Sequence, residues 1–374
     1  MSYHGRFEQA KQPKQPGKKK GLKIFLIVIA VILVLLLILA GAAYLYLQSK
    51  LKKMNIIELP KDTYAYTEPT DEVTRPPETG AAETTEATTE ATVPKMTADD
   101  IINILVVGQA ARAGEESYMA DSTMLVSINT YTKEINCMSV LRDSLVKLPD
   151  YKGHQCGRAK FTVCYNLGHM WGDTAGAMEM TNICLNDNFV VEVDYNVEIS
   201  FDSFIKMIDY IDGIDIELTQ AEADYLNKDT LYVKRTIEPG VQRLQGMEAL
   251  SYARMRKAAG DSESDIKRTE RQRKVVEALL ERFRYMSLSK LNNWVDILMP
   301  MVTTTMTPTD VTKLAAKILP LLPELKIKGY TIPMEGWGDM VDIYDNGEIH
   351  SVMRFDTAKE KKLIRAITEA EVSD

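Results

Sequence analysis

The sequence predicts an α/β layered domain that follows a single membrane-spanning helix. An uninterrupted apolar run near the N-terminus is long enough to cross a bilayer. The Thr- and Glu-rich stretch that comes after it has too few large apolar side chains to form a core. Beyond residue 100, short apolar strand patterns alternate with amphipathic helical patterns, which is typical of a layered α/β fold.

Composition narrows the classes of protein to which the chain can belong. Of its 374 residues, 45% are hydrophobic and 26% are charged, so a sizeable globular core can form. The chain has only four histidines and contains no HExxH motif or Cys/His cluster, which argues against a zinc enzyme. The cysteines lack CxxC spacing, and the sequence leaves open whether they are paired in two disulfides or are buried thiols. These cysteines are Cys137, Cys156, Cys164 and Cys184.

The apolar run Leu22–Leu47 contains one charged residue, Lys23, at its start. Basic residues are in excess before it, so residues 1–21 are expected in the cytoplasm and the rest of the chain outside. The alternative is a cleaved signal peptide, because Ala40-Gly41-Ala42 resembles a cleavage site. The run is, however, longer than the apolar core of about 7–15 residues that signal peptides have.

Residues 48–98 are predicted to be an extracytoplasmic linker. Within them, Tyr66–Lys95 is rich in Thr, Glu, Ala and Pro. Such a segment cannot bury enough apolar surface to offset the entropy lost on ordering. It would tether the following domain close to the membrane.

The main domain is expected over residues 99–285, and residues 286–374 form a C-terminal helical part that completes or follows it. Apolar runs of strand length predict strands, and helical spacing of apolar residues predicts helices. The predicted strands are Ile101–Val107, Thr123–Ile128, Ile135–Leu141, Val190–Val193, Val197–Ile199, Ile214–Leu218 and Ile327–Ile332. The predicted helices are Tyr165–Leu185, Phe201–Ile211, Gln245–Arg256, Ile266–Phe283, Leu291–Val302, Pro308–Leu322 and Thr357–Thr368.

The stretch Ser251–Arg273 concentrates arginines in a chain whose formal net charge is −8. A guanidinium group is always charged and presents a planar fork of donors that matches phosphate oxygens. On a helix, Arg268, Arg271 and Gln272 would share one face. The alternative is a solvated charged surface in which these residues pair with Glu263, Asp265 and Glu270.

Charged residues also mark two predicted strand ends. Asp121 opens one strand, and Arg142-Asp143 closes the next. Charged side chains at strand ends commonly line a cleft, although Asp and Ser there can also be simple turn formers.

Together these features resemble the LytR–CpsA–Psr family over about Ile101 to Arg284. Asp121-Ser122-Thr123 is similar to the family's Ser-Asp-Thr strand start, and the other matching motifs follow in the family's order. They are Ser139–Asp143, Lys160–Gly168, Phe204–Ile216, Leu244–Arg256 and Arg268–Gln272. The resemblance implies a three-layer α-β-α sandwich outside the membrane.

The resemblance also implies an activity. Family members transfer a glycopolymer from a polyprenyl-pyrophosphate carrier to peptidoglycan through a phosphodiester, so the expected partners are that glycolipid, peptidoglycan and the membrane. It implies Mg²⁺ held by Asp121, and an apolar pocket under the sheet for the lipid, with Val126, Ile199 and Leu250 in its lining. The implied catalytic residues are Asp143, Arg142, Arg254 and Arg256. The implied pyrophosphate-binding residues are Arg142, Arg254, Arg256, Arg268, Arg271 and Gln272.

The chain departs from the family pattern at several positions. Gly108-Gln109-Ala110 lacks the Asp of a Gly-x-Asp pattern, and Met119 stands where the family has an arginine. Glu115 or Glu116 could supply the missing ligand and Arg112 the missing cation, and Thr162 replaces an asparagine.

These departures motivate an alternative, a non-catalytic protein that binds lipid pyrophosphate or wall polymer. A nucleic-acid-binding regulator is disfavoured, because the basic cluster is expected outside the cell and no helix-turn-helix is evident.

Overall fold

The chain is described here from a computed structural model. The description covers residues 49, 51–60, 96–109, 120–255, 265–287, 289–290, 293, 296–297, 299–321, 323–345 and 348–369. All but the first belong to one compact unit, Leu51–Asp374. No helix in this part of the chain combines the length and apolar character that crossing a bilayer requires. The predicted span Leu22–Leu47 and most of the predicted linker lie outside the described residues.

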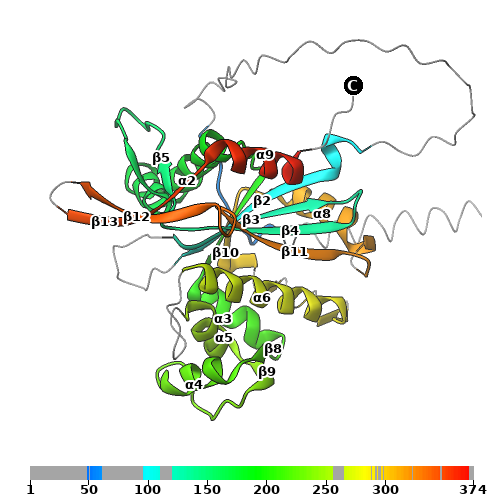
Figure 1. The fold of residues 1–374 in the computed structure, drawn as a ribbon. Helices are drawn as coiled ribbons and strands as arrows, with labels where there is room; N and C mark the ends of the chain where they lie inside the picture. Colours follow the sequence, from blue (N-terminus) through cyan, green and yellow to red (C-terminus); the bar gives the residue numbers. More distant parts are fainter. Residues whose placement is uncertain are drawn as a thin grey trace, which may run out of the picture. The chain divides into compact units, whose positions relative to one another are not determined.

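A seven-stranded mixed sheet with the order β1-β10-β7-β2-β3-β4-β11 is the centre of this unit (Figure 1). β2, β3 and β4 run antiparallel to one another in sequence order. β7 pairs parallel with β2, and β11 pairs parallel with β4. β7 and β11 therefore extend the antiparallel β2-β3-β4 meander on its two sides. The bounds are β1 (Asn55–Ile56), β2 (Ile101–Gln109), β3 (Ala120–Asn129), β4 (Glu134–Val140), β7 (Tyr195–Ser200), β10 (Val302–Thr304) and β11 (Lys326–Ile332).

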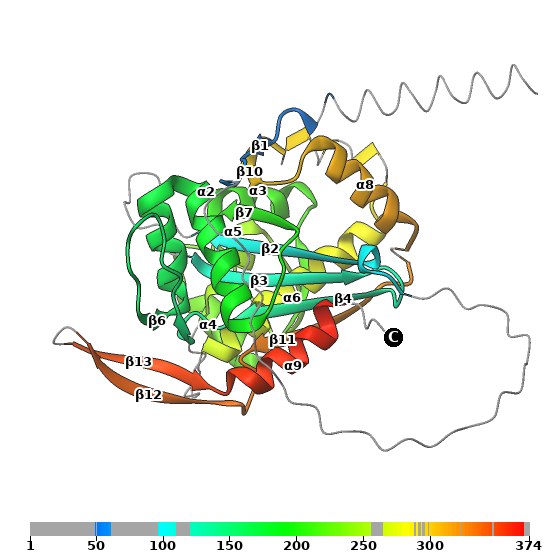
Figure 2. The same ribbon diagram turned by 90° about the horizontal axis from the view of Figure 1, so that it is seen from above.

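One face of the sheet packs on α2 (Phe161–Phe189) and α9 (Thr357–Thr368). Successive side chains of a strand point to opposite faces, so Leu105 and Leu125 enter this core while their neighbours point the other way. Figure 2 looks onto this face. Two short strands, β5 (Leu145–Lys147) and β6 (Arg158–Lys160), lead into α2.

α2 bends back on itself at a kink. Gly172 and Asp173 leave the helical conformation, and Asp173 has a positive φ of 56°. The two halves then approach so closely that a Cβ on Gly168 would lie 2.5 Å from the carbonyl oxygen of Gly176. This approach allows both halves to contribute to one buried core.

A helical layer covers the opposite face (Figure 1). Its own core combines these helices with a two-stranded ribbon of β8 and β9. The elements are α3 (Phe201–Tyr210), β8 (Ile214–Leu218), α4 (Gln220–Lys228), β9 (Gly240–Leu244), α5 (Gly246–Arg254) and α6 (Asp265–Arg284).

The segment after residue 285 supplies β10 and β11 to the main sheet, so it is part of the same domain. It also forms α8 (Pro308–Ile318) and a hairpin of β12 (Gly338–Asp345) and β13 (Glu348–Phe355). The C-terminal part contains strands as well as helices, and the predicted strand Ile327–Ile332 is confirmed within β11. The predicted α/β fold is confirmed, and the structure shows that its central sheet is mixed.

The prediction of a strand at Val190–Val193 is also wrong. Val190 adopts a left-handed conformation that caps α2, and β7 begins only at Tyr195. Val191 is nevertheless buried in the core, which explains the apolar pattern without a strand.

Substituting Gly168 with alanine tests the close approach inside α2. The added Cβ would clash with backbone atoms that cannot move aside, so we expect Gly168→Ala to lower the free energy of unfolding by roughly 1–3 kcal/mol. Gly157→Ala is the matched control, because a Cβ added at Gly157 would meet no atom within 4 Å. Urea unfolding of the two variants measures the difference, and equal stability would contradict the packing of the two halves.

Candidate active site

An apolar cavity of about 520 Å³ lies between the sheet and the helical layer. Its walls come from β2, β3 and β7 on one side and from α3, α5 and α6 on the other. The pocket predicted under the sheet is confirmed, because Val126, Ile199 and Leu250 all line it. Its other apolar residues include Val106, Met124, Phe201, Phe204, Met207, Val275, Val276 and Leu279.

A second groove, of about 820 Å³, runs along α6 and is also lined by β8 and the start of β11. Asp215, Glu217, Glu277 and Glu281 share its lining with Lys274, Arg282 and Lys326. None of the predicted site residues lines it, so volume alone does not identify the candidate site. The smaller cavity combines an apolar interior with convergent polar groups, which is the usual character of a ligand site.

Two arginines and one glutamine bring polar character to this apolar cavity. Arg254, the last residue of α5, lies 4.9 Å from the centre of the Phe201 ring and donates to the Tyr232 hydroxyl at 3.1 Å. Arg268 on α6 is 4% exposed and also lines the cavity. Gln272, one turn further along α6, accepts a hydrogen bond of 3.0 Å from the Ser122 hydroxyl of β3. The helical layer and the sheet thus meet at this point.

Arg271 lies elsewhere. Its Nε donates to the Glu222 carboxylate of α4 at 2.9 Å, and its Nη1 donates to the Met255 carbonyl at 3.2 Å. It does not line the cavity, so the proposed ligand set leaves it out. Burial alone would raise the pKa of Glu222, but the Thr219 N–H and Arg271 outweigh this effect and lower it.

A polar cluster lies at the carboxyl end of β4. The Asp143 carboxylate oxygens lie 2.7 Å from the Lys160 ammonium and 3.6 Å from the Nε of Arg142, so Asp143 forms ion pairs with both side chains. This arrangement favours an orienting role for Asp143 over a role as base. The sequence alone assigns no role to Lys160, although Lys160 opens the family-like motif Lys160–Gly168 and its position in β6 brings it to Asp143.

Thr162 joins this cluster to the start of β3. Its N–H donates to the Arg142 carbonyl at 3.1 Å, and its hydroxyl donates to the Ala120 carbonyl at 3.2 Å. Arg142 itself is not part of the cavity lining. The site therefore has an apolar cavity with Arg254 and Arg268, and a polar edge with Arg142, Asp143 and Lys160.

The magnesium prediction depends on residues that are only partly described. Arg256, Arg112, Glu115 and Glu116 lie outside the described residues, and of Asp121 only the backbone is described, at the start of β3. Within the described part of the chain, no three His, Cys, Asp or Glu side chains gather as a metal site. Asp143 is already paired with cations. The described donors do not by themselves fit Mg²⁺.

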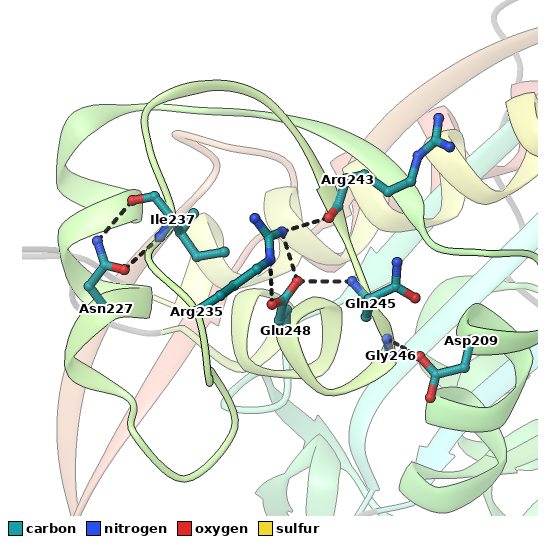
Figure 3. A network of polar contacts seen from close by, with 8 residues as sticks. All are labelled: Asp209, Asn227, Arg235, Ile237, Arg243, Gln245, Gly246 and Glu248. Atoms are coloured by element: carbon teal, nitrogen blue, oxygen red, sulfur yellow. Dashed lines mark hydrogen bonds and ion pairs between the residues drawn. The ribbon is translucent and has the colours of Figure 1, made fainter.

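A polar network fixes the N-terminus of α5 (Figure 3). Glu248 accepts from Arg235 at 2.9 Å and from the Gln245 N–H at 3.0 Å. The Gly246 N–H donates to Asp209 of α3 at 2.7 Å. These bonds fix the N-terminal end of α5, and the bond from Arg254 to Tyr232 fixes its C-terminal end. The residues of α5 that line the cavity lie between these two fixed ends.

Comparison with curated proteins identifies relatives at moderate identity. The chain is 30% identical over 203 residues to the polyisoprenyl-teichoic acid–peptidoglycan teichoic acid transferase TagT of Bacillus subtilis strain 168. That match spans 53% of this chain and 57% of the relative, little more than half of its length. The regulatory protein MsrR of Staphylococcus aureus is 28% identical over 252 residues, which are 67% of this chain and 69% of MsrR.

Solved structures share the fold. TagT bound to LIIa-WTA superposes with a TM-score of 0.55 at 23% identity, covering 72% of this chain and 92% of TagT. YwtF (TagT) with bound octaprenyl pyrophosphate lipid gives a TM-score of 0.52 at 20% identity, covering 74% of this chain and 94% of that one.

The model of the LytR_cpsA_psr family matches residues 72–361, which include the residues that line the cavity and every strand of the main sheet except β1. The resemblance of the sequence motifs is thereby confirmed, and the chain belongs to the LytR–CpsA–Psr family.

Proposed function

We propose that the chain is a membrane-anchored extracytoplasmic phosphotransferase that attaches a glycopolymer, carried on polyprenyl pyrophosphate, to peptidoglycan. The observation that carries the proposal is the apolar cavity with Arg254 and Arg268 in its lining. An isoprenoid chain suits the apolar part, and a pyrophosphate suits the guanidinium groups. The related structure with octaprenyl pyrophosphate and the relatives named as teichoic acid transferases support this ligand class.

The proposed reaction is a phosphoryl transfer, which depends on positive charges around the pyrophosphate. A hydroxyl oxygen of the acceptor sugar attacks the phosphorus that carries the glycopolymer, the bridging P–O bond breaks, and polyprenyl phosphate leaves. The hydroxyl proton passes to the departing phosphate or to water. Such transfers depend mainly on positioning and on neutralising phosphoryl oxygens. Arg254 and Arg268, which line the cavity, would neutralise charge on the pyrophosphate. Asp143 orients Arg142 and Lys160 at the adjoining edge.

Three further parts of the proposal rest on the sequence. The span Leu22–Leu47 would anchor the chain, with its N-terminus in the cytoplasm and the domain on the cell-wall side. Arg256 would join the arginines that bind pyrophosphate. Asp121 would hold Mg²⁺, which supplies additional charge neutralisation on the pyrophosphate when it is bound.

A second candidate is a binding protein of the same fold that holds the lipid pyrophosphate without turnover. The contacts of Asp143 with two cations and the absence of an acidic residue at Ala110 favour it. Turnover separates the two candidates, because both predict binding.

Arg268→Ala tests the charged part of the site. We expect it to lower kcat for magnesium-dependent transfer of a lipid-linked glycopolymer by roughly 10²–10³-fold, the usual cost of one preorganised donor. Arg282→Ala is the control on the same helix, because Arg282 donates to the Ile211 carbonyl and lines only the other groove. Rates are compared per folded molecule. Wild-type binding with no turnover, with or without Mg²⁺, would favour the binding protein, and equal activity of both variants would contradict the arginine assignment.

Leu250→Trp tests the apolar part. The larger ring would displace at least two methylene groups of the isoprenoid, at about 0.8 kcal/mol each, so affinity for octaprenyl pyrophosphate should fall about tenfold. Affinity for inorganic pyrophosphate should not change, because it does not enter the apolar interior. The control is Leu231→Trp, at a leucine that is 63% exposed. Calorimetry measures both affinities, and an equal loss for the two ligands would contradict the assignment of the cavity to the lipid.

A further inference from the structure

A buried ion pair joins three helices behind the cavity. Arg271 of α6 and Glu222 of α4 are each 5% exposed, and their N–O distance is 2.9 Å. The same arginine donates to the carbonyl of Met255, the C-cap residue directly after α5. α4, α5 and α6 therefore meet at a single guanidinium group, and its planar fork of donors allows it to hold two acceptors at once.

This junction is adjacent to both cavity arginines. Met255 directly follows Arg254, so the bond from Arg271 fixes the backbone at the point where the Arg254 side chain leaves α5. Arg268 precedes Arg271 by three residues on α6 and lies about one turn away on the helix. A shift of Arg271 would thus move both cations that line the cavity.

Further groups on α4 and α5 surround the ion pair. Glu222 uses its second oxygen to accept from the Thr219 N–H at 3.0 Å, which caps the start of α4. Tyr252 of α5 is fully buried, and its pKa is raised by burial and by the neighbouring Glu222 carboxylate. Tyr252 lies two residues before Arg254 on the same helix.

We infer that Arg271 and Glu222 form a clamp that sets the spacing of Arg254 and Arg268 for the diphosphate of the lipid. Arg271 is then a positioning residue and contacts no ligand. A buried ion pair contributes little net stability against an apolar replacement, but removal of one partner leaves a buried charge and displaces its surroundings. The inference rests on the proposed function for its ligand, and the geometry of the clamp can be measured without that ligand.

The experiment is a double-mutant cycle on the full chain in detergent. Its variants are Glu222→Gln, Arg271→Gln and the double variant. Asp310→Asn is the matched control, because Asp310 forms the same type of capping box with Thr307 on α8 and has no part in the clamp. Octaprenyl pyrophosphate is the probe, and its affinity is measured well below the melting temperature of every variant. Hydrogen exchange of the peptide that contains residues 252–255 is measured without the probe.

We expect each single variant to lose about tenfold or more in affinity, since small displacements of positioned groups have large effects. The double variant should lose no more than the larger single loss, because one clamp is broken in each case. Exchange at residues 252–255 should accelerate in all three, and Asp310→Asn should match the wild type in both measurements.

Two affinity results would overturn the clamp. A loss in Arg271→Gln with wild-type affinity in Glu222→Gln would make Arg271 a direct ligand. Lower melting temperatures with unchanged affinity in all three variants would leave the pair with a structural role only. Failure of the wild type to bind the probe would instead reject the proposed function. In that case the clamp is tested by hydrogen exchange without the probe, and an unchanged exchange rate at residues 252–255 in the three variants would overturn it.

Discussion

The two-residue alternation of side chains along β2 and β3 is the constraint on which the site depends. Leu105 and Leu125 enter the core beneath α2, so Val106 and Val126 must face the helical layer. That layer leaves a cavity over them, which the arginines of α5 and α6 line. A register slip of one residue in β3 would exchange the two faces and remove the apolar wall of the cavity.

Much of this arrangement could be predicted from the sequence. The inner strands β2, β3 and β4 contain mainly apolar runs, because both faces of the sheet are covered there. The ordered motifs identified the family, and the apolar positions at Val126, Ile199 and Leu250 line the cavity as expected. Arg254, Arg268 and Gln272 are brought together there because α5 and α6 cover the same face of the sheet.

The rest depends on tertiary contacts that sequence spacing does not encode. Arg268 and Arg271 are three residues apart and were expected on one face, yet only Arg268 lines the cavity. The difference is made by Glu222, which lies 49 residues from Arg271 in sequence. β10 has only three residues and is specified by its pairing with β7. The β12–β13 hairpin was missed, although the Asn346-Gly347 dipeptide between its strands is a turn signal.

A crystal structure of the chain with octaprenyl pyrophosphate would show directly where the lipid and its pyrophosphate bind. We expect the isoprenoid between Val126 and Leu250, and the pyrophosphate within hydrogen-bond distance of Arg254 and Arg268. We also expect Arg271 to remain paired with Glu222. An isoprenoid bound in the charged groove along α6, or a pyrophosphate held by Arg271, would contradict this arrangement.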